Sequence, residues 1–223
     1  MMHRSIAGLC LSFALCVGAV QADPTSFMGS LSFAGGGVTG IADNPWLTDG
    51  TAFHWHVTNN QNGTFTYAYL LEVPGKAISH LTIEVSPNFT ARDIVQVLQG
   101  ALAGDQPDDY PKAGDPGMPG PMRGIKFEAG DGSDYAWTVS FISTRGPMWG
   151  DFYAKNGVST GTAVAIWNTG FTDPDPLAPV AGGSVGFHVL VPDTTTVVPA
   201  PGAILLGALG AGTVGWRRRR KTR

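Results

Sequence analysis

Two histidines with a single residue between them give this 223-residue chain one spacing suited to metal binding. His54 and His56 lie on the same face of an alternating run, and imidazoles so placed can chelate zinc or copper. A third ligand, His80 or His188, is conceivable, but the sequence does not bring either one near the pair. Histidines that point outward from a strand produce the same pattern. We favour that interpretation, so we expect no bound metal and no cofactor.

Carboxylates suggest two further chemistries, neither with a specific pattern. Asp131-Gly132-Ser133-Asp134 and Asp173-Pro174-Asp175 could supply oxygen ligands to calcium, but neither forms an EF-hand loop and acidic turns are common. Glycoside hydrolysis needs two carboxyl groups about 5–9.5 Å apart. The candidates that lie in or beside predicted strands are Glu72, Glu84 and Glu128. Their spacing does not single out a pair.

A serine lies within Gly182-Gly183-Ser184-Val185-Gly186, which matches the G-x-S-x-G pattern of hydrolase nucleophile elbows. The elbow requires a strand before the serine and a helix after it. Here a glycine-rich turn precedes the serine, and an apparent strand at residues 187–191 follows it. We therefore interpret the motif as a structural turn, and we expect no catalytic residue and no enzymatic activity.

A cluster of aromatic side chains on a glycine- and proline-rich frame suggests a carbohydrate site. The rings of Trp149, Phe152 and Tyr153 could stack on a sugar. Asp151 and Lys155 could form hydrogen bonds with its hydroxyl groups. The alternative is a loop whose aromatic rings fill one end of the fold, and we favour it over the sugar platform.

Strands must position most of these side chains, because apolar residues alternate with period two in several runs. Phe53, Trp55 and Val57 share one face of a predicted strand. Asn59-Asn60-Gln61-Asn62-Gly63 tolerates positive φ and predicts a hairpin to the next alternating run, residues 65–71. Further strands are predicted at residues 78–85, 124–127, 135–142, 163–167 and 184–191.

One short helix is predicted between Thr90 and Gly100. Thr90 and Asp93 approximate a capping box, and the apolar side of the helix would consist of Ile94, Val95, Val97 and Leu98. Residues 104–123, with five prolines, are predicted to be a long surface loop. Many short strands with glycine and proline turns indicate a mainly β domain at residues 23–191. We expect an antiparallel, jelly-roll-like β-sandwich.

Charge is distributed unevenly along the chain. Residues 23–198 contain all 17 acidic residues but only seven of the 14 basic residues, which gives them a net charge of −10. Such a domain repels polyanions, so we expect neither nucleic acid nor anionic lipid as its partner.

The N-terminus, residues 1–22, has the pattern of a secretory signal peptide. A short basic start precedes an uncharged apolar stretch, and Val20-Gln21-Ala22 suits cleavage after Ala22. The alternative is an uncleaved membrane anchor. Cys10 and Cys16, the two cysteines of the chain, both lie in this segment. The mature domain would therefore contain neither a thiol nor a disulfide.

The C-terminus combines three features after a linker at residues 192–198. Pro199-Ala200-Pro201 precedes an uncharged apolar segment, residues 202–216, which predicts a transmembrane helix about 22 Å long. Residues 217–223 form a basic tail that would stop translocation and remain cytoplasmic. The arginines of this tail that we assign to the membrane stop are Arg217, Arg218, Arg219 and Arg220. The alternative is a buried helix of a soluble protein, which the adjoining basic block disfavours.

This tripartite tail resembles the PEP-CTERM sorting signal of bacterial exported proteins, with Ala200 where the family name has glutamate. The resemblance implies that Pro199-Ala200-Pro201 is recognised by an exosortase, a membrane-embedded cysteine protease or transpeptidase. It also implies a transient inner-membrane anchor, followed by release to the cell surface or to extracellular polysaccharide. The exported domain is similar only to an uncharacterised group of such proteins, through residues 145–157, 167–171 and 191–193.

We therefore expect an exported, non-enzymatic protein of the envelope or extracellular matrix. Two alternatives stay open. One is a carbohydrate-binding module of the cell surface or exopolysaccharide, and the other is a glycan-active or metal-dependent enzyme.

Overall fold

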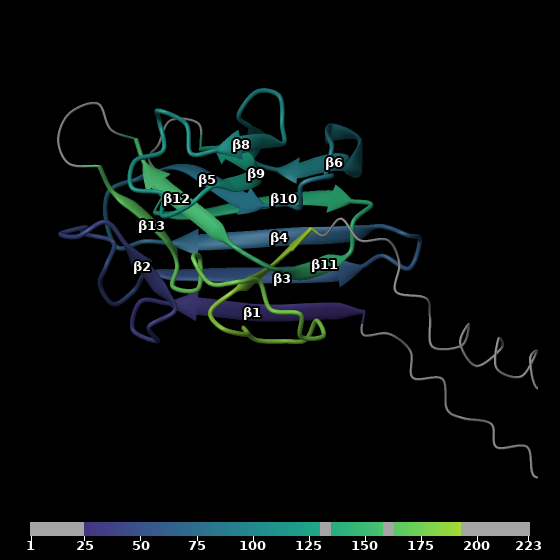
Figure 1. The fold of residues 1–223 in the computed structure, drawn as a ribbon, viewed down its shortest axis with the longest axis horizontal. Helices are drawn as coiled ribbons and strands as arrows, with labels where there is room; N and C mark the ends of the chain where they lie inside the picture. The colour runs from purple at the N-terminus through teal and green to yellow at the C-terminus, as the bar shows by residue number, and fades with distance from the viewer. Residues whose placement is uncertain (1–24, 130–134, 158–162, 193–223) are drawn as a thin grey trace, which may run out of the picture. The chain divides into compact units, whose positions relative to one another are not determined.

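The protein is mainly β, and all strand pairs among its described residues are antiparallel (Figure 1). The computed structural model describes residues 25–129, 135–157 and 163–192. The predicted signal peptide, the sorting tail and the acidic turn at residues 131–134 lie outside them. Within the described residues, no helix has the length and apolar composition needed to span a membrane.

The first sheet contains five strands in the order β1-β3-β4-β10-β6. Its strands are β1 (Ser26–Ser32), β3 (Ala52–Asn59), β4 (Phe65–Glu72), β6 (Ile94–Gln99) and β10 (Ala136–Ser143). The predicted hairpin between β3 and β4 is confirmed by a register in which Asn59 pairs with Phe65. Gln61 and Gly63 adopt positive φ angles of 61° and 83° in the turn, which Asn- and Gly-rich sequences favour.

The second sheet follows the order β2-β13-β12-β5-β9-β7, with β8 also paired to β9. Its strands are β2 (Val38–Gly40), β5 (Ile78–Glu84), β7 (Ala101–Leu102), β8 (Asp108–Tyr110), β9 (Met122–Glu128), β12 (Phe152–Asn156) and β13 (Ala165–Asn168). A separate two-stranded sheet pairs β11 (Pro147–Gly150) with β14 (Val189–Pro192).

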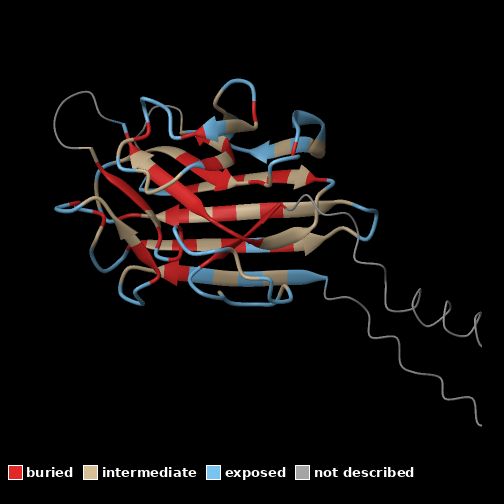
Figure 2. Cartoon of the chain, viewed as in Figure 1, coloured by how far each residue is buried: buried red, intermediate tan, exposed pale blue. Residues whose placement is uncertain are grey.

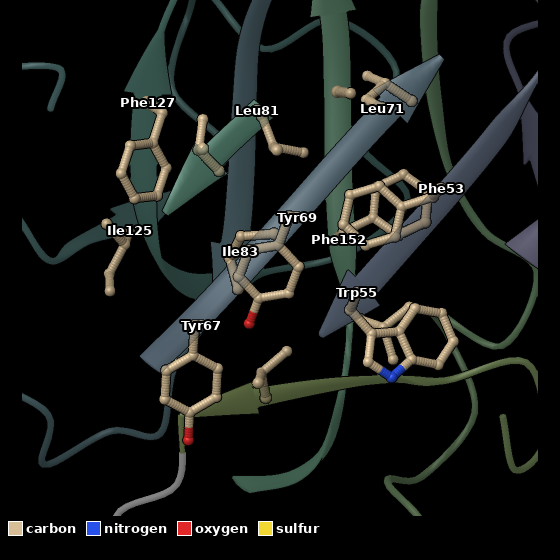
Figure 3. Close-up of a cluster of buried hydrophobic side chains, with 14 of the residues drawn as sticks. Phe53, Trp55, Tyr67, Tyr69, Leu71, Leu81, Ile83, Ile125, Phe127 and Phe152 are labelled. Atoms are coloured by element: carbon tan, nitrogen blue, oxygen red, sulfur yellow. The ribbon is translucent and has the colours of Figure 1, made fainter. Parts of the chain in front are cut away.

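Both large sheets contribute side chains to one hydrophobic core. Buried residues alternate with more exposed ones along β3, β4 and β10, as period-two strands with one inward face require (Figure 2). Phe53 of β3 stacks on Phe152 of β12 with ring centroids 4.0 Å apart, so the two sheets meet through aromatic contact (Figure 3). Tyr69 lies in the same cluster, and its hydroxyl donates to the Leu190 carbonyl at 2.8 Å.

The predicted helix between Thr90 and Gly100 is wrong. A 3₁₀ turn, η1 (Ala91–Asp93), carries the predicted capping box of Thr90 and Asp93, and the chain then continues as β6. Three of the six residues of β6 are β-branched, and the strand pairs with β10 at one edge of the first sheet. The hydrogen bonds of β6 to β10 therefore decide the structure of this segment, although its local apolar pattern also fits a helix.

Two predicted loops are also more ordered than expected. Residues 104–123 include β8, and this segment packs on the second sheet, where the Tyr153 hydroxyl donates to the Pro116 carbonyl at 2.7 Å. The frame around Trp149 consists of strands β11 and β12 rather than a loop. In contrast, the predicted strand at residues 184–191 begins only at Val189, because residues 184–188 form a turn.

Candidate functional site

Four ionisable side chains from distant parts of the chain meet where β11 leads into β12. Asp151 is the single residue between these strands, and Glu84 is the last residue of β5. Asp175 and His188 belong to the segment that connects β13 to β14. Strand β5 pairs with β12, which brings Glu84 beside Asp151. We call Glu84, Asp151, Asp175 and His188 the acidic cluster.

Hydrogen bonds fix Asp151 at the centre of the acidic cluster. The Asp151 N–H donates to Glu84 Oε2 at 2.8 Å, and the Glu84 N–H donates to the Asp151 carbonyl at 3.0 Å. Asn168 of β13 donates from Nδ2 to Asp151 Oδ1 at 2.6 Å. The Asn168 Oδ1 in turn accepts the Phe152 N–H at 2.9 Å. The aspartate is therefore oriented by strands on both sides.

His188 faces two carboxylates without a hydrogen bond to either. Its Nε2 lies 3.7 Å from Oδ1 of Asp151 and 3.7 Å from Oδ1 of Asp175. These separations exceed the usual hydrogen-bond range. The His188 side chain is only 1% exposed, and its Nε2 has no hydrogen-bond partner among the described residues. The other ring nitrogen, Nδ1, lies 3.3 Å from the Val185 carbonyl oxygen.

The G-x-S-x-G segment is the turn that positions His188. The His188 N–H donates to the Val185 carbonyl at 3.0 Å, and the Ser184 hydroxyl donates to the His188 carbonyl at 2.7 Å. Gly183, Gly186 and Phe187 adopt positive φ angles of 82°, 59° and 62°. β14 follows, where a nucleophile elbow would have a helix. The interpretation of this motif as a structural turn is confirmed.

Burial and mutual repulsion raise the pKa values of the carboxyl groups in the acidic cluster. Burial, followed by the charges of Asp175 and Asp151, raises the pKa of Glu84 to about 8. Burial also raises the pKa of Asp151 to about 6, although the Asn168 hydrogen bond and His188 act in the opposite direction. The pKa of Asp175 is raised by burial and lowered by His188. The cluster thus concentrates acidic groups in an environment that disfavours their charge.

The chemistry of the acidic cluster follows from these donor atoms. Ligand atoms of Asp151, Asp175 and His188 lie within 4.8 Å of one another. Carboxylate oxygens with one imidazole nitrogen form a donor set that binds zinc and similar divalent metals in proteins. A metal could therefore be held here by three side chains, with Glu84 as a neighbouring carboxyl group.

The histidine pair predicted from the sequence lies elsewhere. His54 and His56 belong to β3, where they line a hollow of about 310 Å³ together with Met28, Ala68 and Leu70 among others. His54 Nε2 lies 3.2 Å from Glu72 Oε2. Neither proposed third ligand joins them, because His80 contacts Glu128 in the other sheet and His188 lies in the acidic cluster.

The burial of its aromatic residues argues against the sugar platform, the alternative that we did not favour. Trp149, Phe152 and Tyr153 are 1%, 0% and 0% exposed, so their rings cannot stack on a sugar. The Trp149 indole N–H donates to the Ala178 carbonyl at 3.1 Å. Asp151 belongs to the acidic cluster, and Lys155 lies on β12, where burial and the charge of Lys126 lower its pKa. The three aromatic rings are buried inside the fold, which agrees with the favoured interpretation that they fill one end of it.

The sequence points to members of the acidic cluster singly and does not bring them together. Glu84 is one of three candidate carboxylates, His188 a conceivable third histidine, and Asp175 part of a calcium-like turn. The sequence offers no local pattern for the cluster, because its members approach through strand pairing and a long connection.

The chain was also compared with known proteins. No family model matches it, and no similar chain was found among curated proteins or solved structures.

Proposed function

We propose that this chain is an exported, non-enzymatic protein of the cell envelope or extracellular matrix. The observation that carries the proposal is the tail, in which Pro199-Ala200-Pro201, an uncharged segment and an arginine block follow one another. An exosortase-type membrane transpeptidase would be its processing partner. The delivered domain would then associate with the cell surface or with extracellular polysaccharide.

The composition of the domain supports this role. The sequence between the two terminal signals contains no cysteine, so the folded part needs no disulfide formation after export. We propose that this part is a β-sandwich of jelly-roll type, because two large antiparallel sheets share one core. The carbohydrate-binding alternative loses its best candidate residues, since the rings of Trp149, Phe152 and Tyr153 are buried.

Cell fractionation tests the sorting proposal in a host that contains an exosortase. Changing Pro199 and Pro201 to alanine should leave full-length precursor in the membrane, because the recognition motif is lost. Changing the four arginines at 217–220 to glutamine should instead release uncleaved precursor, because the membrane stop is weakened. Pro87 and Pro179 are exposed prolines of the domain, and their double replacement by alanine is the matched control.

Two results would contradict the proposal. One is normal processing of the proline variant, which would show that the motif is not recognised. The other is an unchanged distribution of the wild-type chain in a strain without exosortase.

A further inference from the structure

We propose that Asp151, Asp175 and His188 form a binding site for one divalent transition metal, with zinc as the best match. Nothing in the sorting proposal requires this site, so a result that contradicts one proposal does not contradict the other. The geometry of the acidic cluster and the orientation of one buried imidazole support the site.

The ligand atoms are spaced as a small metal ion requires. Two ligands at about 2.1 Å from a tetrahedral ion are separated by about 3.4 Å. His188 Nε2 lies 3.7 Å from an oxygen of Asp151 and 3.7 Å from an oxygen of Asp175. These two separations are within a few tenths of an ångström of that value, and all three ligand atoms lie within 4.8 Å of one another. The same separations are too long for direct hydrogen bonds.

In the neutral form of the His188 ring, the lone pair of Nε2 points at the carboxylates. A carbonyl oxygen can only accept a hydrogen bond, so the contact of Nδ1 with the Val185 carbonyl requires the proton on Nδ1. In a neutral ring, Nε2 then carries a lone pair directed toward two carboxylate oxygens. The lone pair and the carboxylate oxygens repel one another when no cation is present. A cation between these atoms would be coordinated by all three. Metal-binding histidines commonly donate from the other ring nitrogen in this way.

The burial of His188 Nε2, which has no hydrogen-bond partner among the described residues, supports a bound ligand at this atom. The His188 side chain is 1% exposed. A buried polar atom without a partner destabilises a fold, so proteins rarely retain one without a reason. A bound metal would supply the missing partner.

The charge of the acidic cluster favours a divalent ion. Glu84, Asp151 and Asp175 contribute three carboxyl groups to one region, with a single imidazole among them. An ion of charge +2 would stabilise the ionised form of these carboxyl groups, which burial otherwise disfavours. Asp175 is 35% exposed, which gives the ion a path from solvent.

The donor set selects zinc over calcium. Calcium takes six to eight oxygen ligands, whereas an imidazole nitrogen with carboxylates suits zinc and its neighbours in the first transition series. The calcium-like turn that contains Asp175 thus contributes one ligand to a different kind of site. Asn168 supports the site from β13, because its amide holds Asp151 Oδ1 at 2.6 Å.

The test uses the full chain, stripped with a chelator and titrated with Zn²⁺ and with Co²⁺. We expect one Zn²⁺ per chain, a rise in Tm of several degrees, and visible absorption from bound Co²⁺ of low coordination number. Asp175→Asn and His188→Gln should each weaken Zn²⁺ binding at least about 10-fold. Asp175 is partly exposed, so its variant should fold even where the His188 variant does not.

Two controls make the outcome decisive. Asp173 is an exposed aspartate two residues from Asp175, and Asp173→Asn should bind Zn²⁺ as the wild type does. The double variant His54→Thr/His56→Thr should also bind normally. The proposal fails if the wild type does not bind Zn²⁺ stoichiometrically, or if Asp175→Asn binds it unchanged. It also fails if the double variant loses the ion, since the histidine pair would then be the site.

Discussion

At the scale of single residues, two arginine–aspartate pairs show how strongly burial affects an ion pair. Arg145 Nε donates to Asp93 Oδ1 at 2.8 Å, and these side chains are 21% and 14% exposed. Arg123 lies 3.1 Å from Asp109, whose side chain is 81% exposed. The Arg145 hydrogen bond, with others from Thr90 and Thr144, lowers the pKa of Asp93 to about 2 despite the opposing effect of burial. Only the first pair should contribute measurably to stability.

We predict that Asp93→Asn lowers the free energy of unfolding by about 1.5–3 kcal/mol at pH 7, because it removes charge-assisted hydrogen bonds. The pKa of Asp93 is depressed on folding, so its contribution is present above its ordinary value of 3.8 and is lost as the pH falls toward about 2. The difference between variant and wild type should shrink over this interval. Urea unfolding at several pH values measures it.

Asp109→Asn is the matched control, and it should change stability by no more than about 0.5 kcal/mol. An equal effect of the two substitutions would contradict the assignment of Asp93 as the stabilising partner.

Trp149 provides a second prediction at this scale. Its ring is 1% exposed, and its indole N–H donates to the Ala178 carbonyl in the segment that carries Asp175. Trp149→Ala should cost about 3–5 kcal/mol, as expected for removal of a large buried aromatic side chain. Tyr135 is 56% exposed, so Tyr135→Ala should cost little. If chemical denaturation finds Trp149→Ala as stable as the wild type, the core assignment is wrong.

At the scale of elements, β1 depends on the absence of a side chain at Gly29. This residue pairs with Trp55 of β3, and the Gly183 N–H donates to the adjacent Met28 carbonyl at 2.8 Å. A Cβ atom on Gly29 would lie 2.2 Å from the Trp55 ring and 2.8 Å from the Gly183 carbonyl oxygen. Close packing of three segments therefore requires glycine here.

We predict that Gly29→Ala lowers stability by about 1–3 kcal/mol, because the added methyl group overpacks the contact. Gly114→Ala is the control, since a Cβ atom on Gly114 would meet no other atom within 4 Å and its φ is ordinary. Thermal unfolding compares the two. Equal Tm values for both variants would show that β1 can move away from Trp55 at no cost.

Elements whose pairing is local can be predicted from the sequence, and elements that depend on distant partners cannot. Alternation and an Asn- and Gly-rich turn predict β3, β4 and their hairpin, because all the necessary contacts are adjacent in the chain. The sequence predicts a helix at β6, since its apolar spacing fits both structures and only the edge of β10 decides between them. It predicts a loop at β12, although β12 is a buried strand between β5 and β13.

At the scale of the whole molecule, the dependence on distant partners also explains why the sequence does not predict the acidic cluster. Glu84, Asp151 and His188 are far apart in sequence, and they meet only because β5 pairs with β12 and a long segment returns to β14. Each residue type is visible in the sequence as a candidate for chemistry. Their common location depends on the order of strands, which residue patterns do not encode locally.

The division of charge along the chain is the other feature of the whole molecule. The acidic residues all lie between the two predicted terminal signals, whereas six of the last seven residues are basic. Such a division suits a chain whose ends direct export and are then removed. The domain that remains would be acidic and free of cysteine.

Mass spectrometry of the native exported protein tests the sorting proposal most directly. We predict an N-terminal peptide that begins at Asp23 and a C-terminal peptide that ends before Arg217, because the sorting proposal implies that both terminal signals are removed during export. A C-terminal peptide that still carries residues 217–223 would contradict the proposal, since the tail would then be a permanent anchor.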